Sequence, residues 1–117
     1  MKKRIMIIDD DPVIVNYLET LFDDNGYETA TANDGNEAKR IMTDFKPDLI
    51  TLDLEMPNEW GPKFYRNIMK KTEFQSIPVI VISGLAGREH SIKKAVAYFA
   101  KPFNPDEILN KVKETIG

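Results

Sequence analysis

Short apolar runs alternate with amphipathic stretches along the whole chain. The runs lie at about 4–9, 27–31, 48–53, 78–83 and 97–100. They are nearly continuous in apolar residues, as strands are when both faces of a parallel sheet are covered. Strand patterns that alternate with helix patterns predict a parallel sheet with helices on both faces. We therefore expect an α/β fold built on a single, doubly wound, five-stranded parallel sheet.

Capping residues mark where several of the predicted helices begin and end. Asp11 and Pro12 fit the cap and first position of a helix that Gly26 would stop. Asn104 and Pro105 fit the same two positions of the last helix. Apolar residues at helical spacing predict one buried face per helix: Ile14, Leu18, Leu21 and Phe22; Ala38, Ile41, Met42 and Phe45; Phe64, Ile68 and Met69; Ile108, Leu109, Val112 and Ile116.

The connection between the fourth and fifth strands is unusually short. Only 17 residues separate Ser83 from Lys101, and Gly84 and Gly87 stand at the beginning of this interval. Residues 93–95 favour helix, but the length leaves room for about two turns. The fourth helix is therefore expected to be short or irregular.

Composition narrows the class of protein. The 117 residues predict one domain over 1–117, and 42% hydrophobic residues suffice for one core. A net charge of −3 gives no reason to expect direct nucleic-acid binding. No apolar run is long enough for a membrane span or a signal peptide, and the absence of cysteine excludes disulfides and thiolate metal sites. A cytoplasmic protein is the simplest interpretation.

Polar side chains follow four of the predicted strands at the point where each strand ends. Asp9 and Asp10 follow the first, Asp53 the third, Ser83 the fourth and Lys101 the fifth. Open parallel sheets bind ligands outside the carboxyl ends of their strands, so these groups should gather at one edge. Three acids, a hydroxyl and an ammonium suit a divalent cation together with a phosphoryl group.

At these positions the chain resembles the receiver domains of two-component response regulators, and the resemblance covers its whole length. Five elements in order carry it: Asp9-Asp10, Asp53, Pro57 with Gly61, Ser83, and Lys101-Pro102-Phe103. The resemblance implies a flavodoxin-like sheet with strand order 2-1-3-4-5. It also implies a phosphorylation-controlled switch in two-component signal transduction.

The resemblance further implies a metal site and a phosphoacceptor. Asp53 would accept a phosphoryl group. Asp10 and Asp53 would bind Mg²⁺ directly, together with the backbone carbonyl of Glu55, and Asp9 would act mainly through metal-bound water. The Lys101–Pro102 peptide bond would be cis.

Two further groups would contact the phosphoryl oxygens, and one aromatic residue would respond to them. Ser83 would donate a hydrogen bond to one oxygen, and Lys101 would pair with another. Tyr98 matches the aromatic switch position of the family. Phosphorylation would draw Ser83 towards the phosphoryl group and move Tyr98 inward, which would repack the surface around the fifth strand.

Electrostatics also favour a cation at this edge of the sheet. Two carboxylates about 5 Å apart repel by roughly 3 kcal/mol at an effective dielectric near 20. Three of them with one lysine would strain a fold that holds only about 5–15 kcal/mol of stability. Mg²⁺ is therefore expected to stabilise the folded protein by linkage.

The implied partners are a sensor histidine kinase or phosphotransfer protein upstream, and a protein target or fused output domain downstream. The chain would not be an enzyme beyond catalysing its own phosphorylation and dephosphorylation. Three alternatives remain: a Mg²⁺-dependent phosphatase that uses Asp53 in Asp53-Leu54-Glu55, a docking module that is never phosphorylated, and a nucleotide-binding domain. The last lacks a glycine-rich phosphate loop.

Overall fold

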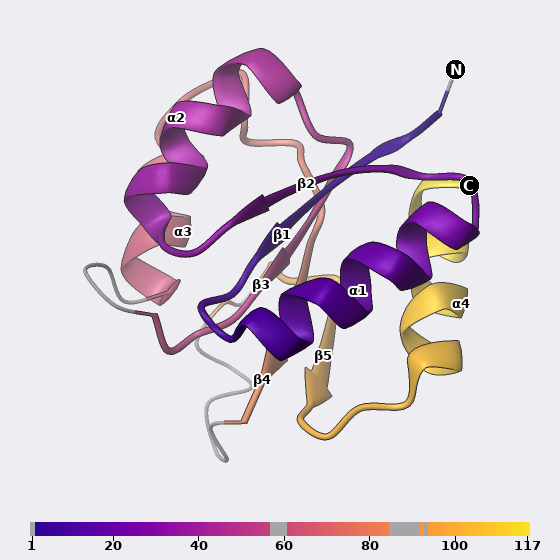
Figure 1. Ribbon diagram of the computed structural model, residues 1–117. Helices are drawn as coiled ribbons and strands as arrows, with labels where there is room; N and C mark the ends of the chain where they lie inside the picture. The colour runs from indigo at the N-terminus through magenta and orange to yellow at the C-terminus, as the bar shows by residue number, and fades with distance from the viewer. Residues whose placement is uncertain (1, 57–60, 85–91, 93) are drawn as a thin grey trace.

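Five strands form one parallel sheet in the order β2-β1-β3-β4-β5 (Figure 1). This computed structural model describes the chain except residues 1, 57–60, 85–91 and 93. Each predicted strand is present, with ends that differ from the expected ones by about one residue: β1 (Arg4–Ile8), β2 (Glu28–Ala32), β3 (Leu49–Leu52), β4 (Val79–Ser83) and β5 (Ala97–Ala100). The predicted fold class and strand order are confirmed.

Helices cover both faces of the sheet (Figure 1). On one face α1 (Pro12–Asp24) and α4 (Pro105–Ile116) lie side by side, and on the other α2 (Gly35–Phe45) packs beside α3 (Gly61–Met69). None of the helices in the described parts of the chain is both long enough and apolar enough to cross a bilayer.

Strand side chains divide between two hydrophobic cores because neighbouring residues of a strand point to opposite faces. Ile5 and Ile7 of β1 pack beneath α1 and α4, whereas Met6 and Ile8 pack beneath α2 and α3. β4 shows the same alternation. This arrangement explains why the strands read as unbroken apolar runs rather than as alternating ones.

The predicted helix caps at Asp11 and Asn104 are confirmed. The Asp11 side chain accepts the backbone N–H of Val13, and the Asn104 side chain accepts that of Asp106. The sequence did not predict where α2 ends. The helix is capped by Lys46, which takes the left-handed conformation with φ of 53° although it is not a glycine.

The predicted buried faces are largely correct, with one shift on α1. Leu18 and Phe22 are buried as expected, but Val15 completes the buried face while Ile14 and Leu21 are only partly buried. Most of the expected short helix between β4 and β5 falls on 85–91 and 93, outside the described residues. That helix stays a prediction.

Candidate functional site

Backbone hydrogen bonds extend the sheet one residue beyond three of its strands and fix the site residues there. The N–H of Asp9 donates to the last carbonyl of β2 at 3.1 Å, and that of Asp53 to the last carbonyl of β1 at 3.0 Å. The N–H of Lys101 donates to the last carbonyl of β4 at 3.1 Å. These residues are thus held side by side, although 92 positions separate Asp9 from Lys101.

Three carboxylates meet at this edge of the sheet. Asp9, Asp10 and Asp53 each offer an oxygen, and these oxygens all lie within 4.8 Å of one another. Asp9 and Asp53 are buried, with exposed fractions of 2% and 6%, whereas Asp10 is exposed. At this spacing the three negative charges repel one another by several kcal/mol unless a cation lies between them.

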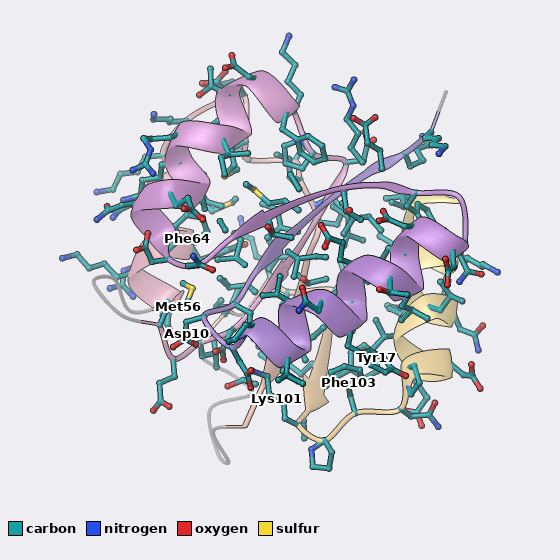
Figure 2. All side chains as sticks on the ribbon, in the orientation of Figure 1. Asp10, Tyr17, Met56, Phe64, Lys101 and Phe103 are labelled. Carbon is teal, nitrogen blue, oxygen red and sulfur yellow. The ribbon has the colours of Figure 1, made fainter. Side chains whose placement is uncertain are left out.

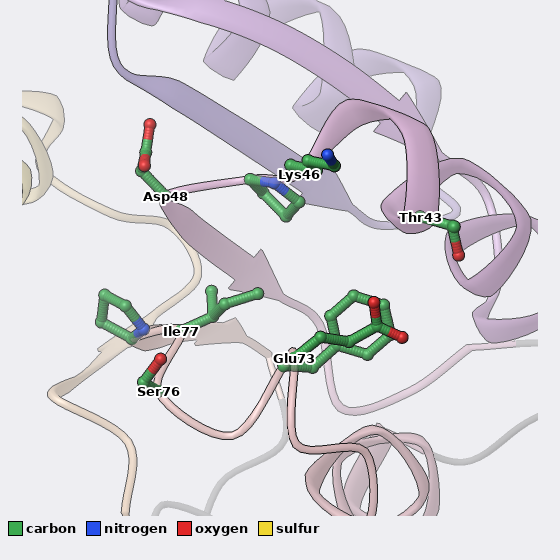
Figure 3. Close-up of a pocket in the computed structure, with 9 residues that line it drawn as sticks. Thr43, Lys46, Asp48, Glu73, Ser76 and Ile77 are labelled. Carbon is green, nitrogen blue, oxygen red and sulfur yellow. The ribbon is translucent and has the colours of Figure 1, made fainter.

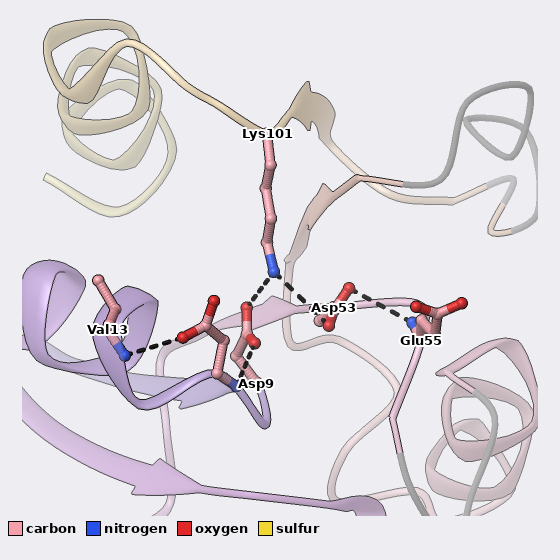
Figure 4. A network of polar contacts seen from close by, with 6 residues as sticks. Asp9, Val13, Asp53, Glu55 and Lys101 are labelled. Carbon is pink, nitrogen blue, oxygen red and sulfur yellow. Dashed lines mark hydrogen bonds and ion pairs between the residues drawn. The ribbon is translucent and has the colours of Figure 1, made fainter.

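Lys101 reaches into this cluster from the end of β5 (Figure 4). Its ammonium lies 2.8 Å from Asp9 Oδ2 and 3.6 Å from Asp53 Oδ2. The other oxygen of Asp9, Oδ1, accepts the backbone N–H of Asp11 at 2.9 Å. Both oxygens of Asp9 are therefore engaged, while the Asp10 side chain forms no hydrogen bond or ion pair within the described part of the chain.

The environment of Asp53 disfavours its charged form. Burial raises the pKa of Asp53 to about 6, and the charges of Asp9 and Asp10 act in the same direction. The Lys101 ammonium and the N–H of Glu55, 3.3 Å from Asp53 Oδ1, oppose this shift without cancelling it. A cation beside this carboxylate would favour its ionised form and lower its pKa.

The cluster holds Lys101 in its charged form. Burial by itself would lower the pKa of Lys101, but the hydrogen bond to Asp9 and the negative charges of Asp9, Asp53 and Asp11 outweigh it, so the pKa lies above its ordinary value. A positive charge therefore persists at this point at neutral pH.

The remaining predicted site residues lie at different depths. Ser83 is buried at the end of β4, and Glu55 has an exposed side chain beside Asp53. Tyr98 is half-buried, and its hydroxyl accepts the backbone N–H of Ile92 at 3.0 Å and donates to the carbonyl of the same residue. The Lys101–Pro102 peptide bond is cis, as the resemblance implied.

Gly61 proves important for a reason that the sequence did not reveal. Its N–H donates to the Leu54 carbonyl at 2.9 Å, and a Cβ at this position would lie 2.7 Å from Leu54 Cα and 2.8 Å from the carbonyl oxygen of Asp53. Glycine thus permits the start of α3 to touch the backbone that follows β3. The second missed residue is Asp11, whose backbone N–H orients Asp9.

The donor set suits Mg²⁺. Hard oxygen ligands are what this ion prefers, and it is typically held by one or two carboxylates with several waters. Exposed Asp10 and buried Asp53 provide such a pair, and Figure 2 labels Asp10 at this end of the sheet. With all three acids ionised, the single positive charge of Lys101 leaves two negative charges, which a divalent cation would balance.

A separate cavity of about 540 Å³ lies at the opposite edge of the sheet (Figure 3). It is bordered by Lys46, Asp48 and Glu73, next to the beginnings of β3 and β4. Because its charged residues are of both signs, the cavity does not favour ligands of one charge. None of the residues that border it belongs to the acidic cluster.

Comparison with known proteins gives a consistent result. A family model described as response regulator receiver domain matches residues 5–113. The protein Rrf1 of Nitratidesulfovibrio vulgaris is 34% identical over 117 residues, covering all of this chain and 85% of that protein.

Two solved structures are also similar. The response regulator TrrA of Thermotoga maritima, in complex with Mg²⁺-BeF, has a TM-score of 0.87 and 34% identity over 97% of this chain and 99% of that one. The receiver domain of a sensor histidine kinase from Pseudomonas aeruginosa, with magnesium in its active-site cleft, has a TM-score of 0.89 and 25% identity over 100% and 99% of the two chains.

Proposed function

Because this chain belongs to the response regulator receiver domain family, we propose that Asp53 is its phosphoacceptor in two-component signal transduction. The convergence of Asp9, Asp10, Asp53 and Lys101 at one edge of the sheet is the observation that carries the proposal. We further propose that the receiver domain comprises residues 1–117 and that it acts in the cytoplasm.

The proposed reaction is a nucleophilic displacement at phosphorus. An oxygen of the Asp53 carboxylate forms a bond to the phosphorus of a phosphohistidine, the phosphorus–nitrogen bond breaks, and the imidazole leaves with the electron pair. The phosphohistidine belongs to a sensor histidine kinase or a phosphotransfer protein. With a small phosphodonor such as acetyl phosphate, the phosphorus–oxygen bond breaks instead and acetate leaves with the electron pair. Beyond its own phosphorylation and dephosphorylation, the chain catalyses nothing.

Three groups of the chain assist this transfer. Lys101, which stays charged between Asp9 and Asp53, turns its ammonium to a phosphoryl oxygen, and the Ser83 hydroxyl donates to another. Asp9 positions Lys101 through the 2.8 Å hydrogen bond. Exclusion of water around the buried Asp53 strengthens each of these interactions.

Mg²⁺ is the proposed cofactor, as in the two similar structures that contain it. Asp10, Asp53 and the Glu55 carbonyl would hold it directly, and Asp9, whose oxygens are already engaged, would act through water. When bound, the ion offsets the repulsion between the carboxylate and the incoming phosphoryl oxygens.

Signal output is proposed to pass through Tyr98 to a protein target or fused output domain. The Tyr98 hydroxyl is bonded to the backbone of Ile92, so inward movement of its side chain would release the segment before β5. The surface around β5 would then present a different shape to the target.

Intact-mass analysis tests the assignment of Asp53. Incubation with acetyl phosphate and Mg²⁺ should add one phosphoryl group to the wild type and none to Asp53→Asn. Asp44→Asn, an exposed acid on α2, should be labelled like the wild type. Equal mass gains in wild type and Asp53→Asn would refute the assignment, and no gain in any protein would favour an unphosphorylated docking module.

A further inference from the structure

A groove of about 530 Å³ runs between α3 and two residues that precede β5, Ile92 and Lys94. Three positively charged side chains border it: Arg66, Lys70 and Lys94. All three are exposed, and within the described part of the chain their side chains form no ion pair or hydrogen bond. No described residue lining the groove is acidic. Within the described part of the chain, no acid neutralises these three cations.

Between these cations the groove is apolar. Pro62 and Ile92 are buried, and Tyr65 and Met69 are half-buried and pack against the core beneath α3. An apolar floor with a charged rim is what binds a short peptide through one buried side chain and several surrounding ion pairs.

The charge of α3 and the turn that follows it differs from that of the rest of the protein. The stretch 61–71 contains Lys63, Arg66, Lys70 and Lys71 and no acid, although the chain as a whole carries −3. Positive charge is thus concentrated on one element of an acidic molecule, and such a field favours and steers negatively charged partners.

We propose that this groove is a docking site for an acidic segment of a protein partner. An apolar side chain of that segment would occupy the floor, and its carboxylates would pair with Arg66, Lys70 and Lys94. The groove is distinct from the phosphorylation site, and docking does not require Asp53 to be modified.

Two observations favour a protein segment over a nucleic acid. The ring of Tyr65 packs against the core, so it does not stand free to stack on a base. Nucleic-acid sites also track a backbone with an extended basic surface, whereas this rim encloses an apolar floor.

The groove is connected to the proposed switch through one of its walls. Ile92 lines it, and both backbone polar groups of Ile92 are bonded to the Tyr98 hydroxyl. A movement of Tyr98 would shift this wall, so docking and the state of Tyr98 would influence each other reciprocally.

Peptide display tests the proposal. The unphosphorylated full chain is used to select binders from a library of random 12-residue peptides. We expect enriched peptides to combine acidic residues with an apolar one. A selected peptide is then synthesised with a fluorescent label and titrated by anisotropy. Its affinity for the Arg66→Glu/Lys70→Glu variant should be about tenfold or more below its affinity for the wild type.

Lys63→Glu/Lys71→Glu is the matched control, because it changes the net charge equally on the same segment without altering the groove. It should weaken binding less than about threefold. Thermal unfolding by circular dichroism and acetyl phosphate labelling should show that both variants fold and accept phosphate like the wild type, which separates this test from that of Asp53.

Several outcomes would overturn the proposal. These are the absence of any enriched peptide, enriched peptides without acidic residues, and equal losses in the two double variants. Groove-dependent binding of a 12-nucleotide single-stranded DNA in place of the peptide would assign the groove to nucleic acid. Concentration-dependent dimerisation that the groove variant abolishes would assign it to a second copy of the chain.

Discussion

One lysine is shared by two of the three carboxylates at the end of the sheet. Lys101 forms its short contact with Asp9, at 2.8 Å, and a longer one with Asp53, at 3.6 Å. Asp53 consequently receives too little positive charge to offset its burial, and its pKa rises to about 6. The carboxylate proposed to react is thus one whose charged form the protein disfavours.

Removing the charge of Asp53 should therefore stabilise the folded protein. Between pH 4 and 6 the folded state retains a proton that the unfolded state has lost, so stability falls as pH rises through this window. In EDTA at pH 7, Asp53→Asn should raise the free energy of unfolding by about 1–3 kcal/mol, and the gain should vanish near pH 4.

Urea denaturation at both pH values measures this difference. Asp44→Asn, which removes an exposed acid, serves as the control and should change stability by less than about 0.5 kcal/mol. A destabilised Asp53→Asn protein at pH 7 would contradict the interpretation of Asp53 as a strained carboxylate.

At the scale of elements, the approach of α3 to the end of β3 depends on Gly61. The Gly61 N–H bonds to the Leu54 carbonyl, and this contact fixes the backbone that carries Asp53. A side chain at position 61 would displace both elements.

Gly61→Ala should destabilise the protein by about 1–3 kcal/mol, because its Cβ would meet rigid backbone atoms. Gly84→Ala is the control, since a Cβ there meets no atom of the described residues within 4 Å. Thermal unfolding compares them, and acetyl phosphate labelling should be slower in Gly61→Ala alone. Equal stabilities of the two variants would argue against the close approach.

Tyr98 ties β5 to the segment before it. Tyr98→Phe removes the hydroxyl that accepts the Ile92 N–H, at a cost of about 1 kcal/mol, so exchange of that amide hydrogen should accelerate about fivefold. Nuclear magnetic resonance can follow this amide. Tyr17 lies on α1 and its ring contacts Phe103, so Tyr17→Phe is the control and should leave the rate unchanged.

The sequence predicted the elements better than the contacts between them. Apolar runs and caps located the strands and most helix starts because both signals are local. The Lys101–Asp9 pair was not foreseen, since it depends on which of several nearby acids the ammonium reaches in three dimensions. The left-handed Lys46 was missed because its residue type gives no signal for that conformation.

For the molecule as a whole, the acidic cluster makes stability depend on divalent cations. Mg²⁺ at about ten times its dissociation constant should stabilise the folded state by about 1.4 kcal/mol. The melting temperature of the wild type should rise accordingly in millimolar Mg²⁺, and that of Asp10→Asn, which lacks an exposed ligand, should rise less.

Scanning calorimetry with and without EDTA measures this effect. A K⁺ salt at the same ionic strength as the Mg²⁺ solution separates binding from general screening of charge. Identical melting temperatures in Mg²⁺ and in the matched salt would count against the metal site.

The backbone hydrogen bonds that extend the sheet beyond β1, β3 and β5 bear on how long a phosphorylated state lasts. Because the backbones of Asp9, Asp53 and Lys101 are anchored in the same ladder as the strands, these backbones cannot shift without breaking it. The lifetime of a phosphorylated state must then be adjusted from the accessible rim, for example at Glu55. Such a division would let the duration of a signal change while the chemistry that starts it stays fixed.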